Sequence, residues 1–290
     1  MAEEIVNYLK LKPGQVIVDA TIGTGGHSAR ILESILPGGR VIGIDRDEES
    51  LEVCRARLAG AKDALILVHG NFSSLDTILD SLGVKKADGI IFDLGISSYQ
   101  LEDSQRGFSF RGDGPLDMRM DRSSYISAYD LVNNLNEEEI STILWNFGQE
   151  RWHNRIARLL VEERQRQPIS TTAQLANIVE RSLPARYRNR FFRIHPATRT
   201  FQAMRIAVNR ELEILEAALA KAIGCLGRGA RICVISFHSL EDRAAKLSFR
   251  RAHSRGLVEI ITPKPLEPRG PEVAANPRCR SSKLRVAERL

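Results

Sequence analysis

The chain has 290 residues, of which 43% are hydrophobic and 27% are charged, and its formal net charge is +6. These values are typical of one large globular domain, or of a large domain with a smaller companion. No apolar run reaches the length of a membrane span and no signal-peptide core is found, so we expect a cytoplasmic protein without a membrane partner. The four cysteines are widely spaced, which indicates neither a disulfide framework nor a zinc site.

Strand-like and helix-like segments alternate along the first 100 residues. We expect helices at 1–12, 27–36 and 48–58, and strands at 16–18, 41–44, 65–68 and 89–93. This alternation predicts a parallel sheet whose strands end at one edge, where ligands collect. Four residues suited to ligand binding fall at that edge: Asp19, Asp45, Phe72 and Asp93.

Helical periodicity without strands follows, and it predicts a small helical domain, residues 103–195, inserted into an α/β domain formed by residues 1–102 and 196–290. In the second α/β segment we expect one long helix that includes 204–219, strands at 231–236 and 283–287, and a surface loop at 263–277.

A glycine-rich stretch from Asp19 to His27 follows the first predicted strand. Backbone without side chains lets a cofactor approach closely and lets the next helix present its amides to the ligand. Asp45 lies 19 residues after Gly26 (45 − 26), close to the spacing of an acid that holds ribose hydroxyls. Ser28 stands where a dinucleotide-binding motif has its third glycine, which favours S-adenosylmethionine over NAD; an ordinary tight turn is the alternative.

Asp93 ends the fourth predicted strand, where amino-group methylases that use S-adenosylmethionine orient the target nitrogen. A carboxylate that accepts a hydrogen bond from an exocyclic amine can aim the delocalised lone pair of the amine nitrogen, so positioning supplies much of the catalysis. The alternative role of Asp93 is to cap a helix. His238 follows the strand at 231–236 and is expected to line the substrate cleft. A serine hydrolase is disfavoured there because no Gly-x-Ser-x-Gly motif is present.

Three aspartates, Asp113, Asp117 and Asp121, recur every fourth residue. No histidine accompanies them, and the spacing equally fits a charged helix face paired with Arg119 and Arg122, so we expect no metal.

The segment from Arg181 to Arg210 contains eight arginines and no acidic residue, with four aromatic residues among them: Tyr187, Phe191, Phe192 and Phe201. Arginine suits phosphates and aromatic rings suit unstacked bases, so this segment favours RNA binding. The alternative is a solvated surface whose aromatic rings turn into the core.

Eight motifs together closely resemble the RsmH (MraW) family over nearly the whole chain: DATIGTGGH at 19–27, GIDRD at 43–47, DLGISS at 93–98, RGFSF at 106–110, DGPLDMRMD at 113–121, HPATRTFQ at 195–202, SFHSLEDR at 236–243 and NPRCRSS at 276–282. The resemblance implies a class I methyltransferase fold, Rossmann-like and mostly parallel, with an inserted helical domain. It also implies methyl transfer from S-adenosylmethionine to N4 of a cytidine in the decoding centre of 16S ribosomal RNA, with ribosomal RNA or the small subunit as partner.

The resemblance places the cofactor contacts at Gly25, Gly26, His27, Asp45, Phe72, Asp93 and Gln100. We expect Asp93 to orient the target amine, and substrate contacts at Asp117, Arg119, Arg199 and His238. Family members usually begin with a His-x-Pro-Val segment, whereas this chain starts within the following helix region. Two rival functions are a DNA amino-methyltransferase, disfavoured because Asp93-Leu-Gly-Ile replaces the Asp/Asn-Pro-Pro-Tyr of those enzymes, and a non-enzymatic RNA-binding protein, which would bind RNA but not S-adenosylmethionine.

Overall fold

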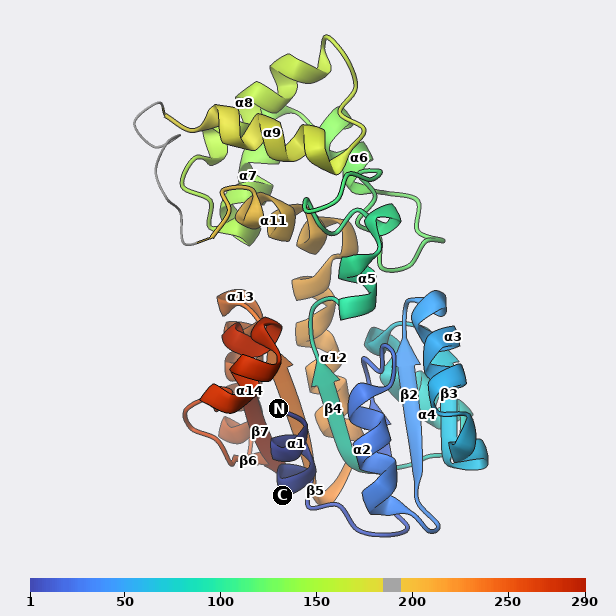
Figure 1. Ribbon diagram of the computed structural model, residues 1–290. Coiled ribbons are helices and arrows are strands. Elements are labelled where there is room, and N and C mark those ends of the chain that lie inside the picture. The colour runs from blue at the N-terminus through green and yellow to red at the C-terminus, as the bar shows by residue number, and fades with distance from the viewer. Residues whose placement is uncertain (185–193) are drawn as a thin grey trace. The chain divides into compact units, whose positions relative to one another are not determined.

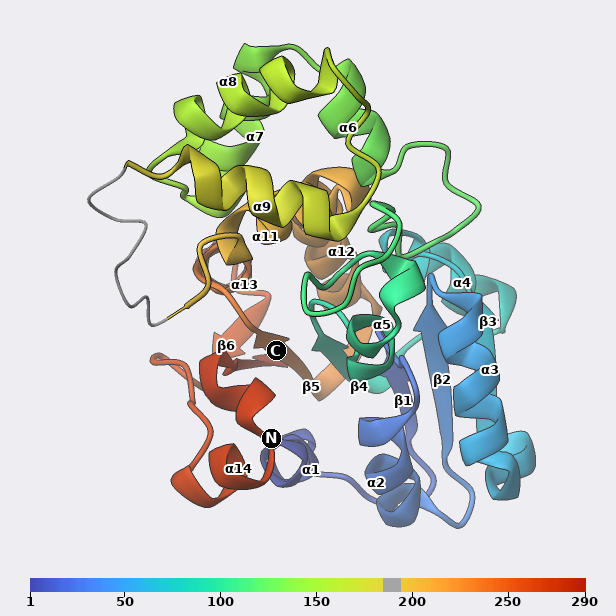
Figure 2. The same cartoon turned by 45° about the horizontal axis from the view of Figure 1, so that its top comes forward.

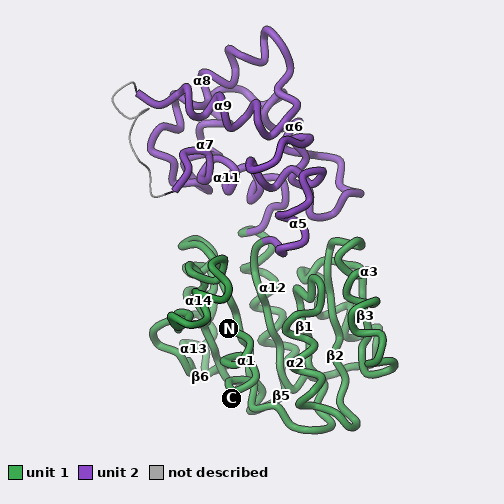
Figure 3. The backbone as a smooth tube through the Cα atoms, viewed as in Figure 1, with its two compact units in different colours: residues 1–95, 212–290 green, residues 96–211 purple. Residues whose placement is uncertain are grey.

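The structure, a computed structural model, describes residues 1–184 and 194–290. It divides into two compact units, unit 1 formed by 1–95 and 212–290 and unit 2 formed by 96–211 (Figures 1 and 3). Unit 2 therefore extends beyond both ends of the range 103–195 that was expected for the insertion. The reason is that helix α11 (Thr198–Asn209), expected in the α/β domain, packs on helix α7 (Glu137–Gly148) of unit 2.

Unit 1 is built on a seven-stranded sheet with the order β3-β2-β1-β4-β5-β7-β6 (Figures 1 and 2 together). Neighbouring strands among the first five are parallel, whereas β7 runs antiparallel to β5 and β6. The strands are β1 (Val16–Asp19), β2 (Arg40–Asp45), β3 (Leu65–His69), β4 (Ala87–Asp93), β5 (Leu226–Ser236), β6 (Val258–Ile260) and β7 (Lys283–Arg289).

Helices cover both faces of this sheet and bury its β-branched residues in two apolar clusters. One face packs against α1 (Ala2–Leu9), α2 (Gly26–Ile35) and α3 (Glu48–Arg57). The other packs against α4 (Leu75–Ser81), α12 (Glu211–Cys225) and α13 (Ser239–Ser254). Because both faces are covered, the central strands read as continuous apolar runs rather than alternating ones.

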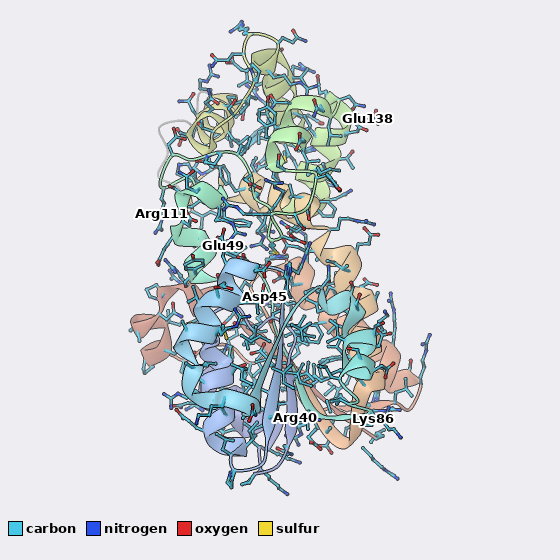
Figure 4. All side chains as sticks on the ribbon, turned by 90° about the vertical axis from the view of Figure 1, so that its right-hand side faces the viewer. Arg40, Asp45, Glu49, Lys86, Arg111 and Glu138 are labelled. Atoms are coloured by element: carbon cyan, nitrogen blue, oxygen red, sulfur yellow. The ribbon has the colours of Figure 1, made fainter. Side chains whose placement is uncertain are left out.

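The strand order reverses between β1 and β4, which is where ligands bind in open α/β sheets. Asp19 is aligned with Ile91 of β4, and Asp93 is aligned with Ile235 of β5. Figure 4 shows Asp45 and Arg40 at opposite ends of β2, so Asp45 lies at the carboxyl edge of the sheet. Asp19 and Asp93 end their strands at the same edge.

Unit 2 has its own apolar core, formed by helices and by the loop at 107–127 between the first two of them. Within the described residues its α-helices are α5 (Ser98–Glu102), α6 (Ala128–Asn134), α7, α8 (His153–Arg164), α9 (Thr172–Ser182) and α11. The expectation of one helix across 204–219 is wrong: Arg210 adopts a left-handed conformation (φ 50°, ψ 35°), which ends α11 before α12 begins.

Two smaller differences lie near the C-terminus of the chain. The expected surface loop at 263–277 contains α14 (Gly270–Ala275), and strand β6 was not expected. Among the described residues we find no helix with both the length and the apolar character of a membrane span.

Candidate functional site

Asp45 ties together the loops that follow β1, β2 and β3. Its carboxylate accepts hydrogen bonds from the backbone amides of Gly23 (2.7 Å) and Asp47 (2.9 Å), and its carbonyl oxygen accepts one from Gly70 (2.8 Å). Burial raises the pKa of Asp45, and hydrogen bonds from the backbone amides of Asp47, Gly23 and Arg46 oppose this rise. A carboxylate has about four acceptor positions, so this one can still accept from a ribose diol.

The glycine-rich loop connects β1 to α2 and places the first turn of α2 at the carboxyl edge of the sheet. Gly25 is the N-cap residue, with φ 80° and ψ 22°, and no side chain caps the helix. The first backbone amides of a helix have no partner within it, so those of α2 can bind a carboxylate. A Cβ atom built at Gly26 meets no atom of the described residues within 4 Å apart from its chain neighbours and its own helix backbone, so there is open space beside the first turn of α2.

His27, in the first turn of α2, faces Asp93 at the end of β4. Its Nε2 lies 3.2 Å from Asp93 Oδ2. The backbone amide of Asp93 donates to Thr21 Oγ1 (2.6 Å), and the buried Asp19 accepts from Ser28 Oγ (2.7 Å). The loop after β1, the start of α2 and the end of β4 are thus joined by polar side chains.

Burial and mutual electrostatic interactions shift the pKa values of Asp19 and His27. Burial raises the pKa of Asp19 to about 6, against the hydrogen bond from Ser28 and the charge of His27. Burial alone would lower the pKa of His27, but the hydrogen bond to Asp93 and the charges of Asp93 and Asp19 outweigh it and raise that pKa. The cationic form of His27 is therefore favoured between the two carboxylates.

Phe72 begins the turn that follows β3, immediately after Asn71, whose side chain accepts from the amide of Ser73. The half-buried Phe72 ring contacts Phe92 edge-on, with centroids 5.6 Å apart and an interplanar angle of 76°. An aromatic ring supported in this way offers an apolar surface to a planar base.

These residues fit S-adenosylmethionine by their donors, acceptors and open space. His27 Nδ1 and Asp93 Oδ1 are buried and have no hydrogen-bond partner among the described residues. Buried polar atoms without a partner are costly, so two of them on neighbouring residues indicate a ligand that satisfies them. The amide end of α2 suits the methionine carboxylate, Asp45 suits the ribose and Phe72 suits the adenine.

His238 also lies at this edge, but its side chain caps a helix. Its Nδ1 accepts a hydrogen bond from the amide of Glu241 (3.4 Å) at the start of α13, and its Nε2 lies 3.1 Å from Glu241 Oε1. The Glu241 carboxylate also accepts from the amide of Phe237 (2.8 Å). His238 therefore has a structural role through Nδ1, whereas its buried Nε2 has no hydrogen-bond partner among the described residues.

Four expected site residues belong to unit 2. Gln100 is buried and completes a capping box with Ser97 at the start of α5. Asp117 and Arg119 form a two-pronged ion pair, with Nε–Oδ1 at 2.7 Å and a second bond at 2.9 Å. Arg199 is exposed on α11 and donates to the carbonyl oxygen of Gln149 (3.2 Å).

Asp117 and Arg119 line a pocket of about 360 Å³ within unit 2. Burial would raise the pKa of Asp117, but the hydrogen bonds and charge of Arg119 hold it below its usual value. The backbone here is a loop, so the charged helix face expected for the three aspartates is wrong, although the pairing with Arg119 is confirmed. Asp113 instead accepts from the amide of Ala173, and Asp121 from Ser123.

The arginine-rich segment is described only in part, because residues 185–193 lie outside the described residues. Phe201 is buried in the core of unit 2, as the alternative interpretation had it. Arg181 pairs with Glu163 (3.1 Å), and Arg205 pairs with Glu211 (2.9 Å). The described part of this segment therefore contains at least three arginines that are engaged within unit 2, these two and Arg199.

Sequence reasoning gave no role to Thr21 or Ser28, which hold Asp93 and Asp19. The only sequence signal for them was their place inside or next to the DATIGTGGH motif. Their partners, the amide of Asp93 and the carboxylate of Asp19, could not be paired with them from spacing alone.

Residues 1–290 match the MraW methylase family. Curated relatives named ribosomal RNA small subunit methyltransferase H, from Geotalea uraniireducens (strain Rf4) and Halothermothrix orenii (strain H 168), are 46% and 45% identical over 306 residues. Each alignment covers 100% of this chain and 97% of the relative. A solved rRNA methylase from Streptococcus thermophilus aligns with a TM-score of 0.44 at 12% identity, over 100% of this chain and 93% of that chain. On the full-length family match and these sequence identities, the chain belongs to the MraW methylase family, and S-adenosylmethionine is its methyl donor.

Proposed function

We propose that this protein transfers a methyl group from S-adenosylmethionine to N4 of a cytidine in the decoding centre of small-subunit ribosomal RNA, in the cytoplasm. The observation that carries the proposal is the buried, unpartnered Oδ1 of Asp93, next to the His27 contact at the edge of the sheet. The names of the relatives, which specify ribosomal RNA of the small subunit, support the substrate class.

In this proposal Asp93 orients the target amine. Oδ2 is held by His27 and the backbone amide by Thr21, so Oδ1 is the atom that can accept a hydrogen bond from N4. S-adenosylmethionine supplies an electrophilic methyl group. A bond forms between N4 and the methyl carbon while the carbon–sulfur bond breaks, and N4 then gives up a proton to water. The barrier falls because the lone pair is aimed before the reaction starts.

The cofactor contacts are part of the same proposal. Gly25, Gly26 and His27 bind the methionine moiety through the start of α2, Asp45 binds the ribose, and Phe72 packs against the adenine. We also assign Gln100 to the cofactor and Asp117, Arg119, Arg199 and His238 to the RNA substrate. Residues 96–211 then act as the substrate-recognition domain.

Exposed aromatic side chains of unit 2 support an RNA substrate. Tyr125 is 98% exposed in the loop before α6, and Trp145 is 56% exposed on α7. A target base must leave its stack before its amine can reach a methyl donor, and unstacked bases pack on aromatic rings. Arg111, labelled in Figure 4, is an exposed cation of the same unit that suits the phosphates around such a base.

The test is methylation of small ribosomal subunits from a strain that lacks the endogenous enzyme, with labelled S-adenosylmethionine. Digestion and mass spectrometry should find N4-methylcytidine at a single site. An Asp93→Asn variant keeps the shape of the side chain, loses its charge and leaves one oxygen for both His27 and N4, so it should transfer methyl at least 100-fold more slowly, with a much smaller loss of cofactor affinity. Methylation of naked duplex DNA, or no transfer by a protein that binds the cofactor, would contradict the proposal.

A further inference from the structure

The outward side of α13 carries cations that have no partner within the described part of the chain. Arg243, Lys246 and Arg250 follow the i, i+3, i+7 spacing that places side chains on one side of a helix. Arg243 and Arg250 are exposed and Lys246 is half-buried. They span two helical turns, about 10 Å along the axis.

Acidic residues near this row are engaged elsewhere. Asp242 holds Arg285 with contacts of 2.7 and 3.2 Å, and the buried Glu241 is bonded at the cap of α13. The next cation, Arg251, pairs with Glu216 of α12 at 3.1 Å. The row of three cations is therefore a net positive surface that the fold itself does not neutralise.

This row begins near the carboxyl edge of the sheet, the edge that carries the candidate site of unit 1. Helix α13 starts three residues after β5, and the register aligns Ile235 of β5 with Asp93. Arg243 lies about one turn into α13, which packs back along one face of the sheet, so the positive surface starts within about one helical turn of the carboxyl edge that carries Asp93 and His27.

We propose that the side of α13 formed by Arg243, Lys246 and Arg250 binds the phosphate backbone of the RNA substrate. The proposal rests on the proposed function and names the surface of unit 1 that holds the RNA. Arginine and lysine bind phosphates without reading sequence, so this surface sets affinity and position rather than base choice. An anionic membrane is the less suitable partner, because none of the exposed large apolar residues of the described chain lies on α13.

The test compares two variants that each change the formal charge by −4. Arg243→Glu with Arg250→Glu alters the proposed surface. Arg57→Glu with Lys85→Glu is the matched control, since Arg57 ends α3 and Lys85 precedes β4, at the amino edge of the sheet where Figure 4 places Lys86. All four residues are exposed and have no ion-pair partner among the described residues.

Methyl transfer to small subunits is measured at several salt concentrations, and cofactor affinity by calorimetry. We expect the α13 variant to raise KM for the subunit about tenfold or more while kcat and cofactor affinity are kept. The slope of log(kcat/KM) against log[salt] should become shallower by about 1.4. This value corresponds to two lost phosphate contacts with single-stranded RNA, at about 0.7 for each contact. The control should stay close to wild type.

Two results would overturn the proposal for α13 and leave the proposed function intact. One is an equal effect of both variants on KM for the subunit. The other is an α13 variant that loses binding to phosphatidylserine vesicles but keeps its KM for the subunit. Wild-type protein that binds cofactor and methylates no subunit would instead refute the proposed function and this inference with it.

Discussion

Gly25 and Gly26 are neighbours in the glycine-rich loop, yet a methyl group would have different effects at the two positions. At Gly25, where φ is +80°, a Cβ would lie 2.8 Å from both Cys54 Sγ and Leu58 Cδ1. At Gly26 it would meet no atom within 4 Å. We predict that Gly25→Ala lowers the free energy of unfolding by about 1–3 kcal/mol. Gly26→Ala should leave stability unchanged and weaken cofactor binding at least tenfold.

Thermal unfolding and calorimetric titration with S-adenosylmethionine distinguish the two effects, with each variant serving as the control for the other. Full cofactor affinity in a folded Gly26→Ala protein would show that the open space beside the first turn of α2 is not the cofactor site.

Asp45 combines two roles, because it holds the amides of Gly23 and Asp47 and has acceptor positions left for a ribose. Asp45→Ala should reduce cofactor affinity by about 10- to 100-fold, since charge-assisted hydrogen bonds contribute about 1.5–3 kcal/mol each. Asp45→Asn keeps one acceptor oxygen and should lose less. Calorimetry measures both; unchanged affinity in Asp45→Ala would refute the ribose role.

Asp19 makes stability depend on pH. Its pKa is about 6 in the folded protein and 3.8 without the protein environment, so the folded state holds a proton that the unfolded state has lost between these values. The free energy of unfolding therefore falls as pH rises from about 4 to 6, by about 3 kcal/mol for a shift of this size. Asp19→Asn removes this group.

We predict that the stability of Asp19→Asn relative to wild type increases over that pH range and is level above it. Urea unfolding at intervals between pH 4 and 8 provides the measurement. Parallel stability curves for the two proteins would show that Asp19 titrates normally in the folded state.

At the scale of elements, the break between α11 and α12 is held by a buried ion pair. Arg205 of α11 donates twice to Glu211, the first residue of α12, at 2.9 Å each, and the two side chains are only 13% and 10% exposed. Glu211→Ala would leave the Arg205 charge buried without this partner, so we expect a loss of about 3 kcal/mol in unfolding free energy.

Glu216 lies on the same helix and provides the control. Its pair with Arg251 is exposed, so Glu216→Ala should cost less than about 1 kcal/mol. Chemical denaturation of both variants tests the difference; equal losses would mean that burial of the Arg205–Glu211 pair has no energetic consequence.

The break at Arg210 also marks what the sequence could and could not predict. The α/β fold of class I methyltransferases is confirmed, because apolar periodicity and glycine-rich turns are local signals that locate every strand of the sheet except β6. The left-handed Arg210 carries no such signal, since glycine is the residue expected there. Strand β6 has only three residues, too few for a recognisable pattern.

Site residues divide in the same way. Asp45 and Asp93 were predicted from their places at strand ends, and they lie there. The loop at 113–121 has helical spacing but is held in another conformation by distant contacts, among them the amide of Met120 donating to Asn209 at 2.8 Å. A contact across 89 residues leaves no trace in local spacing.

At the scale of the whole chain, the two units differ in the number of chain segments from which each is built. Unit 2 is one continuous segment, 96–211, with a core of its own. The apolar clusters of unit 1 draw on both of its segments, since β4 pairs with β5 across the insertion. Residues 1–95 alone would leave β4 with an unpaired edge, and the absence of α12 and α13 would expose one apolar face of the sheet.

We therefore predict that residues 96–211, produced alone, fold into a helical domain with a cooperative thermal transition. For 116 residues (211 − 96 + 1) the enthalpy of unfolding near 60 °C should be about 80 kcal/mol. Residues 1–95 alone should show no cooperative transition, which makes them the control. Circular dichroism and scanning calorimetry provide the measurements. A 96–211 fragment that unfolds without cooperativity would show that the core of unit 2 depends on unit 1 for its stability.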